Sequence, residues 1–157
     1  MAARAAIILA AGRGTRMKSD LPKVLHPVGG RAMVDWSIDL AKRVGCERII
    51  VVCSPAGAAV QAHVRAVLGD DAIAIQDPPQ GTGHAVQCAE DALQDFAGDV
   101  VVLYGDTPLI PANAVEALFL ELENGGRVGV LGFEAEVPGA YGRLIINERG
   151  DLDAIVE

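Results

Sequence analysis

AAIILA at residues 5–10, continuing as AGRGTRMKSDLPK at residues 11–23, is the stretch that sets the architecture of the chain. Its first part is a short apolar run that ends beside a glycine, which is typical of a buried strand in a parallel sheet. Its second part is rich in glycine and in basic side chains. Because open α/β sheets bind ligands beyond the carboxyl ends of their strands, this loop is the first candidate for a functional site.

After this stretch, apolar runs of strand character alternate with segments of helical periodicity. Strands are expected at residues 48–53, 72–76, 99–103 and 128–133, and helices at residues 32–44, 55–68, 82–93 and 111–123, with Thr82 as an N-cap. Residues 141–147 and 152–156 are expected to pair as a hairpin. This alternation indicates βαβ units. We therefore predict an α/β fold with a mostly parallel sheet, helices on both faces and a mixed edge at the hairpin.

Length and composition limit the class of protein. A chain of 157 residues, 51% of them hydrophobic, has the size and composition of one globular domain. Its three cysteines form no Cys-x-x-Cys pair, which favours buried thiols in a reducing cytoplasm over a disulfide framework. No apolar run approaches the ~18–20 residues needed to span a bilayer. We expect a cytoplasmic protein with no membrane contact.

Charge is distributed unevenly along the chain. The net charge is −8, but residues 1–31 hold six basic side chains and one acidic one, a net charge of +5. The remaining residues therefore carry −13. Nucleic-acid binders present extended basic surfaces, so an acidic chain with one basic segment is a poor candidate for that class. The pattern favours a small anionic ligand held at one place.

The basic loop has the chemistry of a phosphate site. Gly12 and Gly14 let the backbone approach a phosphate closely, and successive N–H groups can form an anion-binding nest. Arg13, Arg16 and Lys18 add positive charge. The loop is not a P-loop, because no Gly-Lys-Ser/Thr follows. It is also a poor dinucleotide fingerprint, because a methionine stands where the third glycine belongs. An ordinary glycine-rich turn remains the alternative.

Lys23 strengthens the interpretation of the basic loop. Prolines at positions 22 and 27 stiffen the segment around it, so the lysine is expected to point inward. A constrained ammonium group beside a basic loop suits the stabilisation of charge on a phosphoryl centre. A solvated lysine is the alternative. His26 is predicted to be structural.

Two further turns follow later strands. Gly81, Thr82 and Gly83 open a helix, so their backbone groups can read either a base edge or a phosphate. Asp106 follows the most hydrophobic strand and is well placed to bind Mg²⁺, which uses one or two carboxylates together with substrate phosphates. The alternative for Asp106 is a cap of the turn at Thr107. The segment 141–143 and Glu157 carry a weaker signal, for which a plain hairpin is the better interpretation.

Together these motifs resemble the sugar-nucleotide pyrophosphorylase family. LAAGRGTRM at 9–17, followed by Pro22-Lys23, is broadly shared in that family. A narrower set resembles the members that make UDP-N-acetylglucosamine: SDLPKVLH at 19–26, GGRAM at 29–33, QGTGHA at 80–85, YGDTPL at 104–109 and YGR at 141–143. The resemblance covers the whole chain in order. It implies a Rossmann-like nucleotidyltransferase fold.

The resemblance also implies a reaction and a set of site residues. UMP would pass from UTP to N-acetylglucosamine 1-phosphate, a step of cell-wall precursor synthesis, by in-line attack that releases pyrophosphate. Arg16 and Lys23 would be the catalytic residues, and Asp106 would hold Mg²⁺. The substrate-binding residues would be Leu9, Ala10, Ala11 and Gly12 for uracil and ribose, Gly14, Thr15 and Lys23 for the phosphates, Gln76, Gly81 and Thr82 for uracil, Tyr104, Gly105 and Asp106 near the metal, and Gly142 and Glu157 for the sugar.

Residues 1–157 are expected to be the N-terminal part of a pyrophosphorylase domain. In the family the domain continues with further sugar contacts and an asparagine ligand for Mg²⁺. A β-helical acetyltransferase domain follows and would form a homotrimer. We therefore expect the 157-residue chain to be inactive or nearly so on its own. Two alternatives stay open: a relative that uses CTP or GTP with another acceptor, and a nucleotide-binding fragment without turnover.

Overall fold

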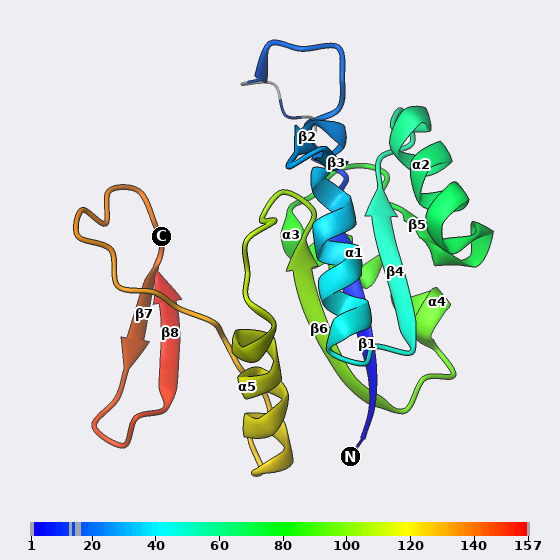
Figure 1. The fold of residues 1–157 in the computed structure, drawn as a ribbon. Helices are drawn as coiled ribbons and strands as arrows, with labels where there is room; N and C mark the ends of the chain where they lie inside the picture. Colours follow the sequence, from blue (N-terminus) through cyan, green and yellow to red (C-terminus); the bar gives the residue numbers. More distant parts are fainter. Residues whose placement is uncertain (1, 13, 15–16, 157) are drawn as a thin grey trace.

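A four-stranded parallel sheet forms the centre of the computed structural model, which describes residues 2–12, 14 and 17–156. Its strands are β1 (Ala3–Leu9), β4 (Arg48–Cys53), β5 (Ile73–Ile75) and β6 (Gly98–Tyr104). They lie in the order β5-β4-β1-β6 (Figure 1). The strand that the sequence places first, β1, is thus central and pairs in parallel with both β4 and β6.

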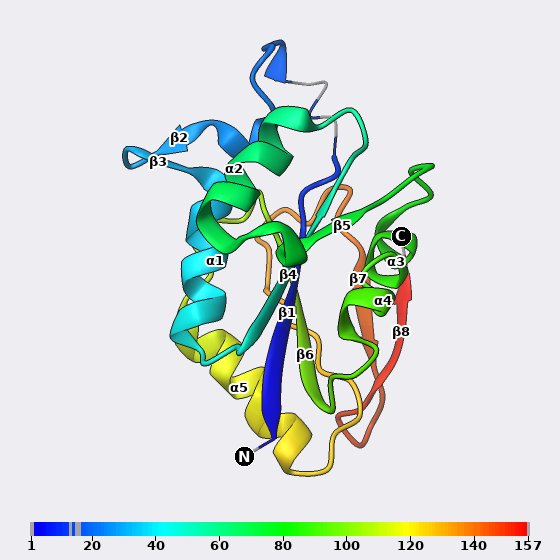
Figure 2. The same cartoon turned by 90° about the vertical axis from the view of Figure 1, so that its right-hand side faces the viewer.

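Helices cover both faces of this sheet, as predicted (Figure 2). On one face lie α1 (Met33–Arg43), α2 (Ala58–Leu68) and α5 (Ala112–Glu123), and on the other lie α3 (Thr82–Gln87) and α4 (Glu90–Leu93). Side chains of a strand alternate between the two faces. Ile8 of β1 accordingly packs with the larger helical layer, whereas Ile7 packs with the layer of α3 and α4.

Two helix boundaries differ from the expected ones. α2 begins at Ala58, because Pro55–Gly57 form a turn in which the Gly57 amide donates to the Ser54 carbonyl oxygen at 2.9 Å. The helix expected at 82–93 is divided into α3 and α4 near Ala89, whose amide donates to the Val86 carbonyl oxygen, three residues back, at 3.0 Å. A three-residue bond is tighter than the α-helical one, so the first helix ends there.

The expected strand at 128–133 is wrong: these residues form no strand. The main sheet ends at β6 among the described residues, and this segment joins none of the described ladders. Gly129 and Gly132 also weaken strand structure, since a glycine loses much entropy and packs no side chain. Apolar residues alone therefore did not make this segment a strand.

The closing hairpin forms as predicted. β7 (Arg143–Ile146) and β8 (Leu152–Val156) pair antiparallel, with a shift in register between Ile145 and Ile146. Among the described residues they make a two-stranded sheet of their own, so the expected mixed edge on the main sheet is absent there.

Short elements complete the part of the chain that the structure describes. β2 (Pro27–Val28) and β3 (Arg31–Ala32) pair as a small antiparallel ladder, and η2 (Lys23–Leu25) and η3 (Asp70–Ala72) are single 3₁₀ turns. These four short elements were not predicted from the periodicity of the sequence. Within the described residues, the helices are too short or too polar to cross a membrane.

Candidate functional site

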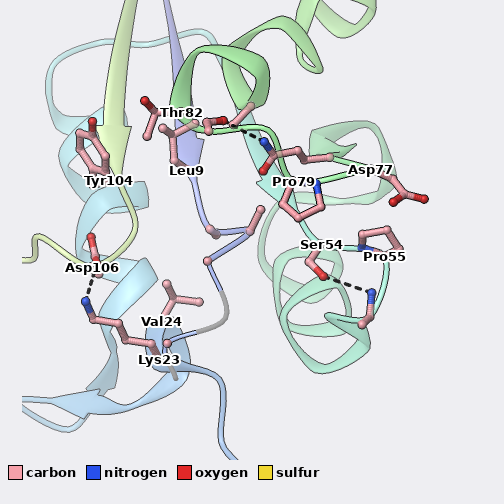
Figure 3. Close-up of a pocket in the computed structure, with 18 of the residues that line it drawn as sticks. Leu9, Lys23, Val24, Ser54, Pro55, Asp77, Pro79, Thr82, Tyr104 and Asp106 are labelled. Carbon is pink, nitrogen blue, oxygen red and sulfur yellow. Dashed lines mark hydrogen bonds and ion pairs between the residues drawn. The ribbon is translucent and has the colours of Figure 1, made fainter. Parts of the chain in front are cut away.

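A cavity of about 850 Å³ lies at the carboxyl ends of β1, β4, β5 and β6 (Figure 3). This is the edge of a parallel sheet at which ligands bind in open α/β folds. Most of the predicted site residues line it: Leu9, Ala10, Ala11, Gly12, Gly14, Lys23, Gln76, Gly81, Thr82, Tyr104 and Asp106. The topology thus brings four loops that are far apart in the sequence into one site.

Lys23 and Asp106 meet across this cavity. Nζ of Lys23 lies 2.6 Å from Oδ2 of Asp106, as Figure 3 shows, and each side chain is about one third exposed (37% and 34%). Lys23 is held at the start of η2, where the Leu25 amide donates to the Pro22 carbonyl oxygen at 2.9 Å. The lysine therefore points into the cavity, as the flanking prolines predict.

Gly14 lies directly against Lys23. Its φ angle is +57°, a left-handed conformation that favours glycine, and a Cβ atom there would stand 2.7 Å from the Cβ of Lys23. Glycine at this position therefore lets the loop after β1 close on the lysine.

The turn that carries Asp106 is held by hydrogen bonds of the neighbouring residues, so the carboxylate of Asp106 is not needed to cap it. The amide of Gly105 donates to the Leu9 carbonyl oxygen at 2.9 Å, and a Cβ on Gly105 would lie only 3.2 Å from that oxygen. Gly105 thus supports the turn without lining the cavity. The Thr107 hydroxyl donates to the Tyr104 carbonyl oxygen at 3.0 Å. Thr107 therefore caps this turn itself, and the carboxylate of Asp106 has Lys23 as its partner among the described residues.

Gln76 and the turn at Gly81 form another side of the cavity. The Gln76 side chain is only 5% exposed, and its Nε2 donates to the Gly81 carbonyl oxygen at 2.9 Å. Gly81 has a φ angle of +94° and is the N-cap of α3. The N-cap prediction for Thr82 is wrong: its position is the first of the helix, and no side chain caps this end. The predicted base-reading residues are nevertheless adjacent in the structure.

His26 has a structural contact. Its Nε2 lies 3.1 Å from the Leu21 carbonyl oxygen, and its amide donates to the Lys23 carbonyl oxygen at 3.1 Å. The ring thus helps to hold the segment that carries Lys23, as predicted.

The structure does not bring Gly142 to the cavity. Gly142 stands just before β7 and is not among the residues that line the cavity. Thr15, Arg16 and Glu157, like Arg13 of the basic loop, fall outside the residues that the structure describes.

Sequence reasoning missed the loop that follows β4 and, in the loop that follows β5, the residues between Gln76 and Gly81 that line the cavity. Ser54, Pro55, Asp77 and Pro79 line the cavity and are labelled in Figure 3. They carry no glycine-rich or basic motif, so residue type gave no signal. Their position directly after two parallel strands was the signal available, because all carboxyl ends meet at one edge.

The side chains that line the cavity suit a metal ion whose ligands include the phosphates of a substrate. No cluster of three or more His, Cys, Asp or Glu side chains that could hold a metal occurs within the described residues. Mg²⁺ is commonly bound through one or two carboxylates plus substrate phosphates. The carboxylate of Asp106 at the cavity wall, with the ammonium group of Lys23 beside it, fits that mode of binding.

Comparison with known proteins identifies the fold family. A profile of the MobA-like NTP transferase domain matches residues 6–152. The chain belongs to this family. Among the relatives of this NTP transferase domain, the bifunctional protein GlmU of Hyphomonas neptunium is 63% identical over 98% of the chain and 33% of its own length. GlmU of Maricaulis maris is 55% identical over 98% of the chain and 34% of its own length. The chain thus spans about a third of the length of these relatives, which confirm the resemblance seen in the sequence.

Solved structures agree on the fold of the NTP transferase domain. The inositol-1-phosphate CTP transferase of T. maritima superposes with a TM-score of 0.72 at 20% identity, covering 99% of this chain and 64% of that one. HddC of Yersinia pseudotuberculosis complexed with GMP-PN gives 0.70 at 23% identity, covering 100% and 69%. These likenesses confirm an α/β nucleotidyltransferase fold.

Proposed function

We propose that this NTP transferase domain moves UMP from UTP to N-acetylglucosamine 1-phosphate, producing UDP-N-acetylglucosamine and pyrophosphate. The observation that carries the proposal is the Lys23–Asp106 pair in a cavity that also holds the Gln76–Gly81 turn. One part of the cavity thus has the groups that a triphosphate and Mg²⁺ need, and another has polar groups for a base. The similarity to GlmU supports the choice of UTP and of the sugar phosphate.

The proposed reaction is an in-line displacement at the α-phosphorus. A sugar-phosphate oxygen forms the new bond to this phosphorus, and the bond from the α-phosphorus to the bridging oxygen of the leaving pyrophosphate breaks. The ammonium group of Lys23 stabilises the charge that develops on the α-phosphoryl oxygens, and Arg16 is proposed to do the same. Catalysis is then positioning and electrostatics, without a covalent protein intermediate.

The other residues have binding roles in this proposal. Asp106 would hold Mg²⁺, which neutralises phosphate charge when bound. The backbone from Leu9 to Gly12 would contact uracil and ribose, and Gly14 and Thr15 the phosphates. Gln76, Gly81 and Thr82 would read the base, Tyr104 and Gly105 would support the substrate beside the metal, and Gly142 and Glu157 would contact the sugar.

We also propose how the domain fits the intact protein. The chain would be the N-terminal part of a pyrophosphorylase domain in a cytoplasmic enzyme. An acetyltransferase domain elsewhere in that enzyme would make it a homotrimer. We expect residues 1–157 alone to bind UTP with Mg²⁺ in calorimetry but to show little or no turnover. Full turnover by residues 1–157 would contradict this.

Two variants of the full-length protein test the site. Lys23→Ala should lower kcat about 10²–10³-fold, the loss typical of one preorganised charge-stabilising group, with a much smaller change in UTP affinity. Asp106→Asn should abolish Mg²⁺-dependent formation of UDP-N-acetylglucosamine. Lys42→Ala, an exposed lysine of α1 outside the cavity, is the matched control and should keep normal rates. Near-normal rates in both site variants would show that the site is assigned wrongly.

A further inference from the structure

His84, the third residue of α3, stands beside the buried amide of Gln76 and has no part in the function proposed above. Nε2 of Gln76 lies 2.9 Å from the Gly81 carbonyl oxygen and 3.3 Å from Nδ1 of His84. A carbonyl oxygen only accepts hydrogen bonds, so the amide nitrogen of Gln76 must be the atom that faces Gly81. The orientation of the amide is therefore fixed by its surroundings.

The amide nitrogen has two hydrogens and two acceptors within reach. Gly81 takes one hydrogen and Nδ1 of His84 takes the other. For Nδ1 to accept, the ring must be neutral with its proton on Nε2, because both nitrogens of a charged imidazolium are donors. One helical turn further on, Sγ of Cys88 lies 4.0 Å from Nδ1 and 3.8 Å from Nε2. His84 is thus held between Gln76 and Cys88.

Once both hydrogens are used, Oε1 of Gln76 is the atom left for a ligand. It accepts no hydrogen bond from the described residues. Every fully buried side-chain oxygen among those residues has a partner, so Oε1 is not fully buried. Gln76 lines the cavity, so this oxygen presents an acceptor to it. An acceptor there pairs with a base whose ring nitrogen carries a hydrogen.

We propose that His84 is a positioning residue that keeps Oε1 of Gln76 turned to the cavity and thereby sets the preference for uridine over cytidine nucleotides. The N3 atom of uracil is a donor, whereas the N3 atom of cytosine is an acceptor that Oε1 repels. Without the second acceptor, the amide is held by Gly81 alone and can rotate away from the productive orientation. The proposal rests on the proposed function, because it needs a nucleotide in this cavity.

The test is a ratio of affinities measured by calorimetry on the full-length protein with Mg²⁺, first with UTP and then with CTP. His84→Phe keeps a ring but removes the acceptor, and should lower the preference for UTP over CTP about 3- to 10-fold, the range for one hydrogen bond. His84→Asn places an amide oxygen near the position of Nδ1 and should retain most of the preference. His63→Phe is the matched control: that histidine pairs with Asp35 at 2.7 Å, outside the cavity, so the ratio should not change.

A purely structural role gives a different result. If His84→Phe weakens UTP and CTP binding equally, His84 only packs and the proposal is wrong, while a wild-type preference for UTP leaves the proposed function standing. If the wild-type protein does not prefer UTP, both fail. A second measurement needs no variant: ¹⁵N NMR of the wild-type histidines should show Nδ1 of His84 unprotonated and Nε2 protonated. A proton on Nδ1 would overturn the proposal even if the variants do not fold.

Discussion

The ion pair of Lys23 and Asp106 bears on how a metal ion would reach the proposed site. The ammonium group lies against the carboxylate at 2.6 Å, the side of Asp106 that a divalent cation would also approach. In the proposed function, Lys23 and a metal ion would compete for Asp106 until the phosphates of the nucleotide pair with the ammonium group. We therefore expect Lys23 to oppose metal binding without nucleotide and to support nucleotide binding.

We predict effects of opposite sign for Lys23→Met. Affinity for Mn²⁺ alone, measured by electron paramagnetic resonance, should rise about three- to fivefold, because an ion pair this exposed is worth up to about 1 kcal/mol. Affinity for UTP without metal should fall, because the triphosphate loses a cation. Lys42→Met should change neither quantity. A fall in Mn²⁺ affinity would show that Lys23 does not compete at Asp106.

Residue type predicted the residues that line the cavity where the side chain is charged or where glycine is needed. Glycine, lysine and aspartate after strands pointed to Gly14, Lys23 and Asp106, and all three lie in one place. Ser54 and Asp77 escaped notice because their roles come from the position of their loops. His84 belongs to the QGTGHA motif at 80–85, but its contact with Gln76 depends on the course of the turn that joins β5 to α3.

The helices and strands were predicted correctly where their buried apolar residues form a periodic stripe or a continuous run. α1, α5 and the four sheet strands match the expected segments closely, because each packs an apolar stripe or run in the core. The segment 128–133 is also apolar but forms no ladder with any of the described strands. A strand forms only when it pairs with a neighbouring strand, and the periodicity of a segment does not show whether such a neighbour is available.

Phe119 is predicted to be the side chain on which the docking of α5 depends. It is 1% exposed, and the guanidinium of Arg4 lies over its ring at 4.4 Å. Phe119→Ala should lower the free energy of unfolding by about 3–5 kcal/mol, measured by urea denaturation. Leu120→Ala, on the same helix but 53% exposed, should cost about 0.5 kcal/mol or less. Equal losses in the two variants would contradict the packing of α5 described above.

Two cysteine thiols are buried in the molecule: Cys53 is the last residue of β4, and Cys46 lies between α1 and β4. Burial raises the pKa of Cys46 and of Cys53 to about 11, from an ordinary value of 9.0. Their ionisation therefore begins in the unfolded chain at lower pH than in the folded one. Stability from this source is complete below pH 9 and is lost as the pH rises toward 11.

The prediction is a difference between two urea-denaturation series, one for the wild-type protein and one for a Cys46→Ala, Cys53→Ala variant. Between pH 9 and 11 the wild type should lose stability more steeply than the variant, which lacks these thiols. Lysine and tyrosine ionisation affects both proteins and cancels in the comparison. Parallel curves would show that the two thiols do not contribute.

The parallel order of the main sheet was predictable because helices alternate with its strands, and such crossovers make parallel neighbours. The separate hairpin sheet was not, because a hairpin's own pattern fixes its pairing but not its place beside β6. The functional edge follows from the parallel order alone. Because the strands run in one direction, their carboxyl ends bring together the four loops that line the cavity.

Transfer of the α-phosphoryl group is the most direct measurement of what this fold is proposed to do. The full-length protein is incubated with Mg²⁺, N-acetylglucosamine 1-phosphate and UTP labelled with ³²P at either the α or the γ position, with unlabelled CTP, GTP and ATP as competitors. We predict that the α label enters the sugar nucleotide, that the γ label leaves in pyrophosphate, and that the competitors reduce the product little. Transfer of the γ label to the sugar phosphate, or stronger use of another base, would contradict uridylyl transfer at this site.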